Sequence, residues 1–581
     1  MTTTTPADSD LTTLFTVPVP APAVDRQESA EVYADLRRLQ VRLGEKRPLI
    51  TDPARLRSLL ELCAISDPRL FHAMFLHHCM TIGTALDKGA APQDIAALAS
   101  GEWIGAALMN ETGCGNSSTT VRTEARYDPA TGDFVLHTPD PAAAKGPANV
   151  GLDAVARLAV VSARLLTGGT DRGTALFLVA LRDGNGPCPG IAIEPLPPTA
   201  PLPLDYATVR FDHVRVPRAR WLADGARISA DGSFHDPLGT ADARTRRSLD
   251  MARFCWGAVS AGLAAAARAG TALALAHARR RTTADRLAGP TVALDHLNQQ
   301  RLLFGATAQA LAATTVARRA THRSWHIPPG GGHGNGPAGS VLRELALAKV
   351  TAGTLSEAAL TRCRSAAGAA ALFSLGRVSN YQAFAQVFTS AGGDNRMLLL
   401  DAAWTMATKK DYRPPDETSA PDDHIRLLRA RERLLHRELT AHLAGPAGTA
   451  PDFDTWNRRT GTAEHFALAH TARTTAETLH EKWRISAPGP ARTPGLLAEL
   501  YHLHCLEQID AHSGWYLAQG LLTTRHVLAL PRQADETCRR LAPHAGALTE
   551  LLEVPSPLLD GPLRPIGPSR TPTPAGRRES T

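Results

Sequence analysis

The chain has 581 residues and a mass of 61.8 kDa, which exceeds a single hydrophobic core and predicts several domains. Hydrophobic residues make up 43% and charged residues 20%, a balance typical of globular proteins, and the many alanines favour helix. The net charge of +7 is spread over many arginines, without a basic block or an aromatic-interleaved basic stripe, so nucleic-acid binding is not expected.

The eight cysteines are scattered along the chain, with no C-x-x-C pair, no disulfide-framework spacing and no signal peptide before them. We therefore expect reduced thiols and a cytoplasmic protein. The most apolar stretch, Cys255 to Ala267, is interrupted by Arg268 and is shorter than the roughly 18 residues of a membrane span. It predicts a buried helix and no membrane contact.

Both ends of the chain are rich in Thr, Pro and Gly and lack helical periodicity, so residues 1–27 and 561–581 are expected to be disordered. In residues 28–103 apolar side chains recur every three or four positions, as in "LRSLLELCAI" and "LFHAMFLHHCMTIGTAL". This spacing predicts an N-terminal α-helical domain.

Residues 104–244 have the texture of a small antiparallel β domain. The segment "TVRTEARYDPATGDFVLHTP" alternates, turns at its Asp-Pro-Ala-Thr-Gly-Asp loop and alternates again, which predicts a β-hairpin. Further strands are predicted in "RLAVVSARLL", "TALFLVAL", "GIAIEPL" and "ATVRFDHVRVP", which Gly and Pro clusters separate.

Helical periodicity returns in residues 245–410, which predict a second α-helical bundle. The Gly-rich segment 327–339 follows no strand and begins with Pro-Pro, so it is interpreted as an inter-helix loop and not as a phosphate loop. A Pro-rich linker at 411–423 leads to a C-terminal α-helical domain at 424–560.

Local groupings of metal-binding or nucleophilic residues carry little signal. His77-His78 and His502-x-His504-Cys505 occupy adjacent or i, i+2 positions, which point to different faces of a helix, so no metal is proposed. The sequence also lacks a G-x-S-x-G elbow, which argues against a serine hydrolase.

One Gly-rich, polar stretch entering the predicted hairpin, "GEWIGAALMNETGCGNSS" (101–118), resembles the flavin-contacting segment "G-x-x-A-M-T-E-x-G-H-G-S" of acyl-CoA oxidases and dehydrogenases. Four further landmarks follow in the family's order. They are "VRFDHVRVPRARWL" (209–222) beside "F-D-N-V-R-V-P-R-x-x-L", "SLDMAR" (248–253), "LDHLNQQRLLF" (294–304), and "GGDNRMLLLDAA" (392–403) beside "E-G-D-N-T-V-L-L-L-Q".

The last helices resemble the extra C-terminal domain of the oxidase branch, and the resemblance covers about residues 30–560. It implies a mainly α fold with a central β domain between helical domains. It also implies an FAD-dependent oxidoreductase that desaturates an acyl thioester, carried on CoA or a carrier protein, as in fatty-acid β-oxidation. Molecular oxygen is the implied electron acceptor and a homodimer the implied assembly.

In this family a carboxylate removes the α-proton of the acyl group, and proton removal by a placed side chain contributes about 10²- to 10⁴-fold. The residue matching the Glu of "E-G-D-N" is Gly392, and the alternative position on the "L-D-L-E-R" helix is Ala252. Neither is an acid. Asp394, two residues from Gly392, is the nearest candidate base.

The other residues matched to the family's sites fall into two groups. The resemblance implies flavin contacts for Asn110, Gly113, Ala148, Asn149, Arg281, Gln299, Gln300 and Asn395. It implies substrate contacts for Asp250 and Arg253. Several family features are missing, since "C-G-G-H-G" becomes "AAGAAA" (366–371) and "K-W-x-x-G-N" becomes "KGPAN" (145–149).

Two alternatives therefore stay open beside acyl-thioester oxidation. The first is a flavin-dependent decarboxylation or monooxygenation on the same fold, in which loss of CO₂ makes a base dispensable. The second is a non-catalytic partner subunit that keeps the fold and the dimer surface but has lost the flavin loops.

Overall fold

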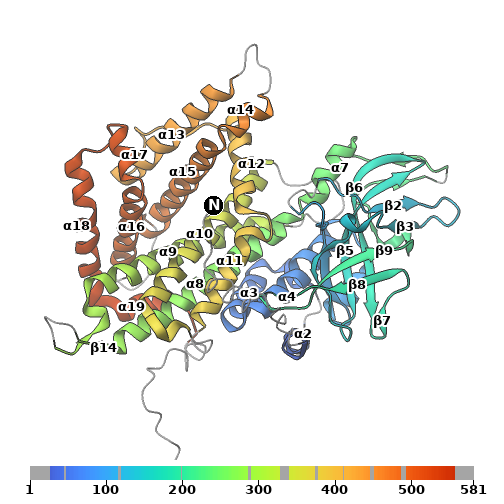
Figure 1. Cartoon of the computed structure of the whole chain (residues 1–581), viewed down its shortest axis with the longest axis horizontal. Coiled ribbons are helices and arrows are strands. Elements are labelled where there is room, and N and C mark those ends of the chain that lie inside the picture. The colour runs from blue at the N-terminus through green and yellow to red at the C-terminus, as the bar shows by residue number, and fades with distance from the viewer. Residues whose placement is uncertain are drawn as a thin grey trace, which may run out of the picture.

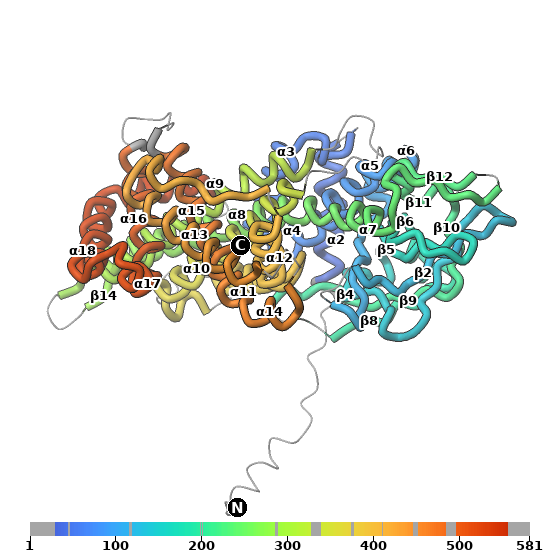
Figure 2. The backbone as a smooth tube through the Cα atoms, turned by 90° about the horizontal axis from the view of Figure 1, so that it is seen from above, coloured from blue at the N-terminus to red at the C-terminus, as the bar shows by residue number. Residues whose placement is uncertain are grey.

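The computed structural model shows an elongated molecule with a β domain at one end and helices over the rest of its length (Figures 1 and 2). The residues it describes are 26–44, 47–115, 119–197, 199, 201–229, 231–284, 289–326, 339–372, 377–409, 411–444, 451–485 and 493–555. The predicted disordered ends, apart from residues 26 and 27, and nearly all of the Gly-rich segment 327–339 lie outside these ranges.

The N-terminal helices pack beside the β domain. They are α2 (Arg26–Leu43), α3 (Pro53–Ser66), α4 (Pro68–Phe75), the π-helical segment η2 (Leu76–Gly83), α5 (Thr84–Asp87) and α6 (Pro92–Ala99). Asp52 and Asp67 cap α3 and α4 by accepting hydrogen bonds from backbone N–H groups, and each helix begins with proline. These are the residue types that favour a helix start.

The β domain contains a large twisted sheet and a smaller one. The strands are β1 (Ile104–Leu108), β2 (Glu124–Tyr127), β3 (Phe134–His137), β4 (Lys145–Asn149), β5 (Arg157–Thr167), β6 (Thr170–Asp183), β7 (Gly186–Pro187), β8 (Ile191–Pro195), β9 (Tyr206–Phe211), β10 (Val214–Val216), β11 (Trp221–Leu222), β12 (Arg227–Ile228) and β13 (Phe234–His235).

The large sheet runs β10-β3-β2-β5-β6-β11, and the smaller one runs β4-β9-β8. The predicted β2–β3 hairpin is confirmed. The large sheet is not wholly antiparallel, because β5 pairs in parallel with β1 and with β2. Strand β5 is almost entirely buried, as expected for a strand covered on both faces.

The second bundle is built on one long central helix. Its elements are α7 (Ala241–Leu249), α8 (Ala252–Arg280), the strand pair β14 (Thr282–Thr283) and β15 (Thr291–Val292), α9 (Leu297–Ser324), α10 (Gly339–Ala367), α11 (Val378–Ser390) and α12 (Asn395–Thr408). Helix α8 is rich in Ala and Gly, which lets its neighbours approach closely; the ring of Phe71 lies against Gly262.

By length and composition, the segment Ala241–Arg280 is apolar enough to cross a membrane, contrary to the expectation that Arg268 interrupts it. Its most apolar stretch is wholly buried inside the protein, as in the core helix of a bundle, so this is weak evidence for a membrane span. Arg268 is tolerated there because its guanidinium donates to Leu552 O at 3.0 Å and pairs with Glu61.

The last helices form a layer at the end opposite the β domain (Figure 1). They are α13 (Asp423–Leu443), α14 (Phe453–Asn457), α15 (Thr460–Leu479), α16 (Thr493–Asp510), α17 (Ser513–Ala518), α18 (Thr524–Leu541) and α19 (Ala545–Leu551). Asp422 caps α13, and α16 and α18 pack on α9 of the second bundle. The predicted fold class, mainly α with a central β domain, is confirmed.

Candidate functional site

The loop in which glycine replaces the family's catalytic acid joins α11 to α12. Gly392 and Gly393 have φ angles of +67° and +94°, a left-handed conformation that glycine adopts readily. Asp394 is the N-cap of α12, and its Oδ1 accepts from the backbone N–H groups of Arg396 at 2.9 Å and Met397 at 3.2 Å. The N-cap bonds commit one carboxylate oxygen of Asp394, the predicted base, to its own helix.

Two side chains of the second bundle donate hydrogen bonds to backbone carbonyls of this loop. Trp256 Nε1 donates to Gly392 O at 3.1 Å, and Lys349 Nζ donates to Gly393 O at 2.6 Å. Lys349 also donates to Asn395 Oδ1 at 2.8 Å, so the oxygen of this predicted flavin contact is already bonded. Burial lowers the pKa of Lys349 to about 8. The loop is therefore fixed by the protein itself.

A cysteine lies against the position where the family's carboxylate would be attached. A Cβ atom added to Gly392 would lie 2.8 Å from the Sγ of Cys255, closer than normal packing allows. Cys255 is buried, and burial raises the pKa of its thiol to about 11. Ala252 lies three residues earlier on α8. Sequence reasoning missed Cys255, because only the fold brings it next to Gly392.

On the β-domain side, the predicted flavin residues come together around β4. Ala148 and Asn149 are buried on β4, and the N–H of Gly146 donates to Asn110 O at 3.1 Å, which ties the β1–β2 loop to that strand. Gly113 lies on the same loop, where a Cβ would meet Ala142 Cβ at 2.7 Å, so its close packing requires glycine.

A histidine that the sequence reasoning passed over lies next to Asn149. His72 on α4 is 8% exposed, and its Nε2 lies 2.8 Å from Asn149 Oδ1. Burial lowers the pKa of His72 to about 4, so the ring is neutral near pH 7. Because a carboxamide oxygen only accepts, Nε2 carries the proton and Nδ1 the lone pair.

His72 is surrounded by rings. Its ring centroid lies 5.1 Å from that of Phe75, 6.3 Å from that of Tyr206 and 6.0 Å from that of Phe388. Phe388 is on α11 and lies 3.8 Å from a Cβ built on Gly392, so His72 and the glycine loop border one aromatic cluster. His72 Nδ1 and Asn149 Nδ2 are buried without a hydrogen-bond partner among the described residues.

The remaining predicted flavin residues lie at the other end of the molecule. Arg281 directly precedes β14, and Gln299 and Gln300 lie in the first turn of α9; Figure 2 shows β14 and β4 far apart along the long axis. Gln300 Nε2 donates to Leu294 O at 3.1 Å, whereas its Oε1 is buried without a partner in the described part of the chain. One chain therefore does not bring both groups around one ligand.

Asp250 and Arg253, predicted to contact substrate, are instead part of a buried ion network between domains. Lys88 Nζ donates to Asp250 Oδ1 at 3.0 Å, and Arg253 Nη2 donates to Asp87 Oδ1 at 2.8 Å. Arg253 also donates to Ser324 O at 2.7 Å. The two residues are 5% and 2% exposed, and their hydrogen bonds join the N-terminal helices to the second bundle.

Comparison with solved structures identifies the fold, in which a β domain lies between helical domains and a C-terminal helical layer is added. Acyl-CoA oxidase-1 of Caenorhabditis elegans, described as complexed with FAD and ATP, superposes with a TM-score of 0.76 and 22% identity over 94% of this chain and 86% of that chain. The fold is that of an acyl-CoA oxidase.

The sequence comparisons give the family. The profile of acyl-CoA oxidase matches residues 420–563. The mouse acyl-coenzyme A oxidase-like protein is 26% identical over 500 residues, 78% of this chain and 76% of that protein. The peroxisomal acyl-coenzyme A oxidase 3 of Arabidopsis thaliana is 25% identical over 503 residues, 78% of this chain and 70% of that protein. The chain is similar to acyl-CoA oxidases along most of its length, which confirms the predicted resemblance and the predicted enzyme class, an oxidoreductase acting on CH–CH groups.

One expectation is overturned. A cytoplasmic location was inferred from single, reduced cysteines, but the Arabidopsis relative is peroxisomal by name. Free thiols indicate a reducing environment and do not distinguish between compartments that share it. All eight cysteines are free in the described structure.

Proposed function

We propose that the chain binds FAD and oxidises an acyl thioester between its α and β carbons, with molecular oxygen as electron acceptor. The observation that carries this proposal is the buried junction of β4, α4 and α11, where Asn149 Nδ2 and His72 Nδ1 lack partners among the described residues. Buried polar groups require hydrogen-bond partners. A polar heteroaromatic ring with donors and acceptors on its edge would supply partners for these two nitrogen atoms. The chemistry that bound FAD would supply is acceptance of a hydride from the β carbon.

Asn110, Gly113, Ala148 and Asn149 hold the flavin ring in this proposal. Arg281, Gln299 and Gln300 come from a second copy of the chain, because Arg281 directly precedes β14, which lies far from β4 (Figure 2), and the two glutamines begin α9. A homodimer thus completes each site. Asn395 contributes by orienting the loop, since its oxygen is bonded to Lys349.

Subunit complementation tests the shared site. Asn149→Leu and Gln300→Leu are each expected to be inactive, since each removes one side of both sites in a homodimer. Co-expression yields heterodimers with one intact site, so about one quarter of the wild-type activity returns if the two variants pair at random. Failure of recovery with both variants folded and dimeric would contradict sharing and leave the single-chain oxidase untouched.

His72 is the proposed acceptor of the α-proton in place of the absent carboxylate. Its imidazole is neutral, and the hydrogen bond to Asn149 directs the Nδ1 lone pair away from that side chain and leaves it available. The α-proton passes to Nδ1 as the carbon–hydrogen bond breaks. The side chain of Asn149 stabilises the resulting imidazolium through its Oδ1, and the surrounding rings exclude water.

A single experiment separates this proposal from its alternatives. Anaerobic addition of acyl-CoA to purified, FAD-loaded protein should bleach the flavin, and His72→Asn should slow bleaching at least tenfold while the flavin stays bound. Bleaching unchanged in His72→Asn would reject the histidine as acceptor.

A base-independent flavin reaction is the second candidate, and it is favoured by the capping role of Asp394 together with Gly392 and Ala252. When a saturated acyl-CoA is added to such an enzyme, the flavin would stay oxidised. It would instead release CO₂ from a carboxylated acyl substrate or incorporate oxygen-18 from labelled oxygen gas. Either product would replace desaturation as the activity.

A further inference from the structure

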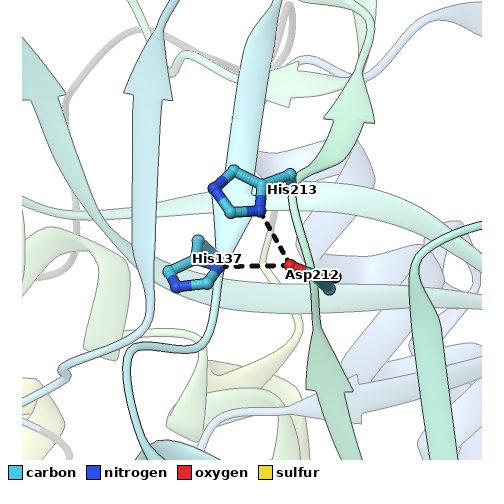
Figure 3. Close-up of side chains that lie close together, drawn as sticks. All are labelled: His137, Asp212 and His213. Carbon is cyan, nitrogen blue, oxygen red and sulfur yellow. Dashed lines mark hydrogen bonds and ion pairs between the residues drawn. The ribbon is translucent and has the colours of Figure 1, made fainter.

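Three potential metal ligands meet on the outer face of the β domain, away from the predicted flavin residues. His137 ends β3, while Asp212 and His213 form the turn between β9 and β10 (Figure 3). One ligand atom from each of the three side chains lies within 4.8 Å of the others. His213 Nδ1 lies 2.7 Å from Asp212 Oδ1, and His137 Nδ1 lies 3.8 Å from the same oxygen.

The backbone fixes the positions from which these side chains project. Thr138 N donates to Phe211 O at 2.8 Å, and Phe211 N donates to Thr138 Oγ1 at 2.9 Å, so the end of β3 is fastened to the end of β9. Asp212 N donates to Gly190 O at 2.8 Å. The turn is therefore anchored on both sides.

His213 adopts an unusual backbone conformation. Its φ of +50° is left-handed, which costs a residue with a side chain about 1 kcal/mol relative to glycine. This conformation turns the imidazole toward His137, and the two ring centroids are 4.4 Å apart at an interplanar angle of 35°. The acyl-CoA oxidase pattern "F-D-N-V-R-V-P" has asparagine here, so the second imidazole is a departure from that pattern.

His137 supplies an independent observation. Its Nδ1 is buried and has no hydrogen-bond partner among the described residues, although it faces the carboxylate of Asp212 (Figure 3). A cation between the two histidines and the aspartate would accept this lone pair.

We propose that His137, Asp212 and His213 bind a divalent transition-metal cation of the zinc class. Two imidazole nitrogens and one carboxylate oxygen form the donor set that such ions prefer, whereas Mg²⁺ and Ca²⁺ prefer oxygen donors. Metal–ligand distances of about 2.0–2.2 Å are reached by small side-chain rotations. Because the side chains of Asp212 and His213 are exposed, water can occupy a fourth coordination position. The bound ion links β3 to the β9–β10 turn.

The test uses the full-length, FAD-loaded protein after dialysis against a chelator. Titration with ZnCl₂ by calorimetry and with CoCl₂ by visible absorbance should each reveal one saturable site, which excess MgCl₂ does not displace. His213→Asn, which introduces the residue of the family pattern, should weaken Zn²⁺ binding at least tenfold. His137→Gln should do the same.

His235→Asn is the matched control, because His235 is an exposed histidine on β13 of the same domain and outside the cluster. It should leave the affinity unchanged, and Zn²⁺ should raise the Tm of the wild type and of this control but not that of His213→Asn. Absence of a saturable site in the wild type would overturn the proposal. So would equal Zn²⁺ affinity in the wild type and in His213→Asn.

Discussion

Restoring the carboxylate at position 392 requires two changes, because the backbone and Cys255 both oppose a side chain there. Gly392 has a φ of +67°, and a left-handed conformation costs an L-residue about 1–2 kcal/mol. An added Cβ lies 2.8 Å from Cys255 Sγ, and overpacking of this kind costs about 1–3 kcal/mol. Gly392→Glu alone should therefore lower the free energy of unfolding by about 2–5 kcal/mol.

Adding Cys255→Ala removes the sulfur atom and with it the overpacking, but not the backbone cost. The double variant should consequently be more stable than the sum of the two single changes predicts, with a coupling of about 1–2 kcal/mol. Urea denaturation of the wild type, both single variants and the double variant measures this coupling. If the glycine is the reason for a slow α-proton transfer, the double variant should also reduce its flavin about 10²- to 10⁴-fold faster with acyl-CoA.

Cys363→Ala provides the control, because Cys363 is a buried cysteine on α10, about 21 Å further along that helix than Lys349, which contacts the loop. Its effect should add to that of Gly392→Glu without coupling. Additive free energies in the Cys255 cycle, or a Gly392→Glu protein as stable as the wild type, would refute the steric reasoning. An unchanged rate of flavin reduction in a folded double variant would refute its catalytic part.

Three further outcomes follow from the same contacts. Arg253→Met should cost about 1–3 kcal/mol of unfolding free energy, because buried Asp87 loses one cationic partner while Lys88 and Arg247 remain, and the hydrogen bond to Ser324 O is lost. Arg246→Ala, at an exposed pair, should cost less than about 0.5 kcal/mol; equal losses in denaturant titrations would reject the network. Lys349 has its pKa lowered to about 8 when folded, so between about pH 8 and 10.4 the unfolded chain binds more protons and stability from this group rises with pH. Lys349→Met lacks this group, so the stability of the wild type minus that of the variant should rise over this pH range, and a flat difference would contradict the burial of the ammonium group. His72→Asn should keep FAD bound but slow its reduction, as stopped-flow absorbance would measure.

Elements with a strong local pattern could be predicted from the sequence, and contacts between distant segments could not. The β2–β3 hairpin follows from alternation and turn residues, and the identity of Gly392 follows from the neighbouring "GGDN". In contrast, Cys255 and Gly392 are 137 positions apart, and only the packing of α8 against the α11–α12 loop makes them neighbours.

The partners of buried charges could not be predicted from the sequence either. Asp250 and Arg253 match a family segment, but whether an arginine faces a ligand or an aspartate depends on what packs beside it, and here Lys88 and Asp87 lie 162 and 166 positions earlier in the chain. The N-cap bonds that Asp394 accepts from Arg396 and Met397 likewise emerge only from the structure. The pairing of His137 with His213 likewise depends on strand register.

The central claim is that this acyl-CoA oxidase-like protein still binds flavin and uses it on an acyl thioester. The absorbance spectrum of the purified protein, recorded before and after anaerobic addition of acyl-CoA, tests it most directly. We predict the visible absorbance bands of bound FAD and their loss on addition of the thioester. A colourless protein that takes up no FAD on reconstitution would contradict the account.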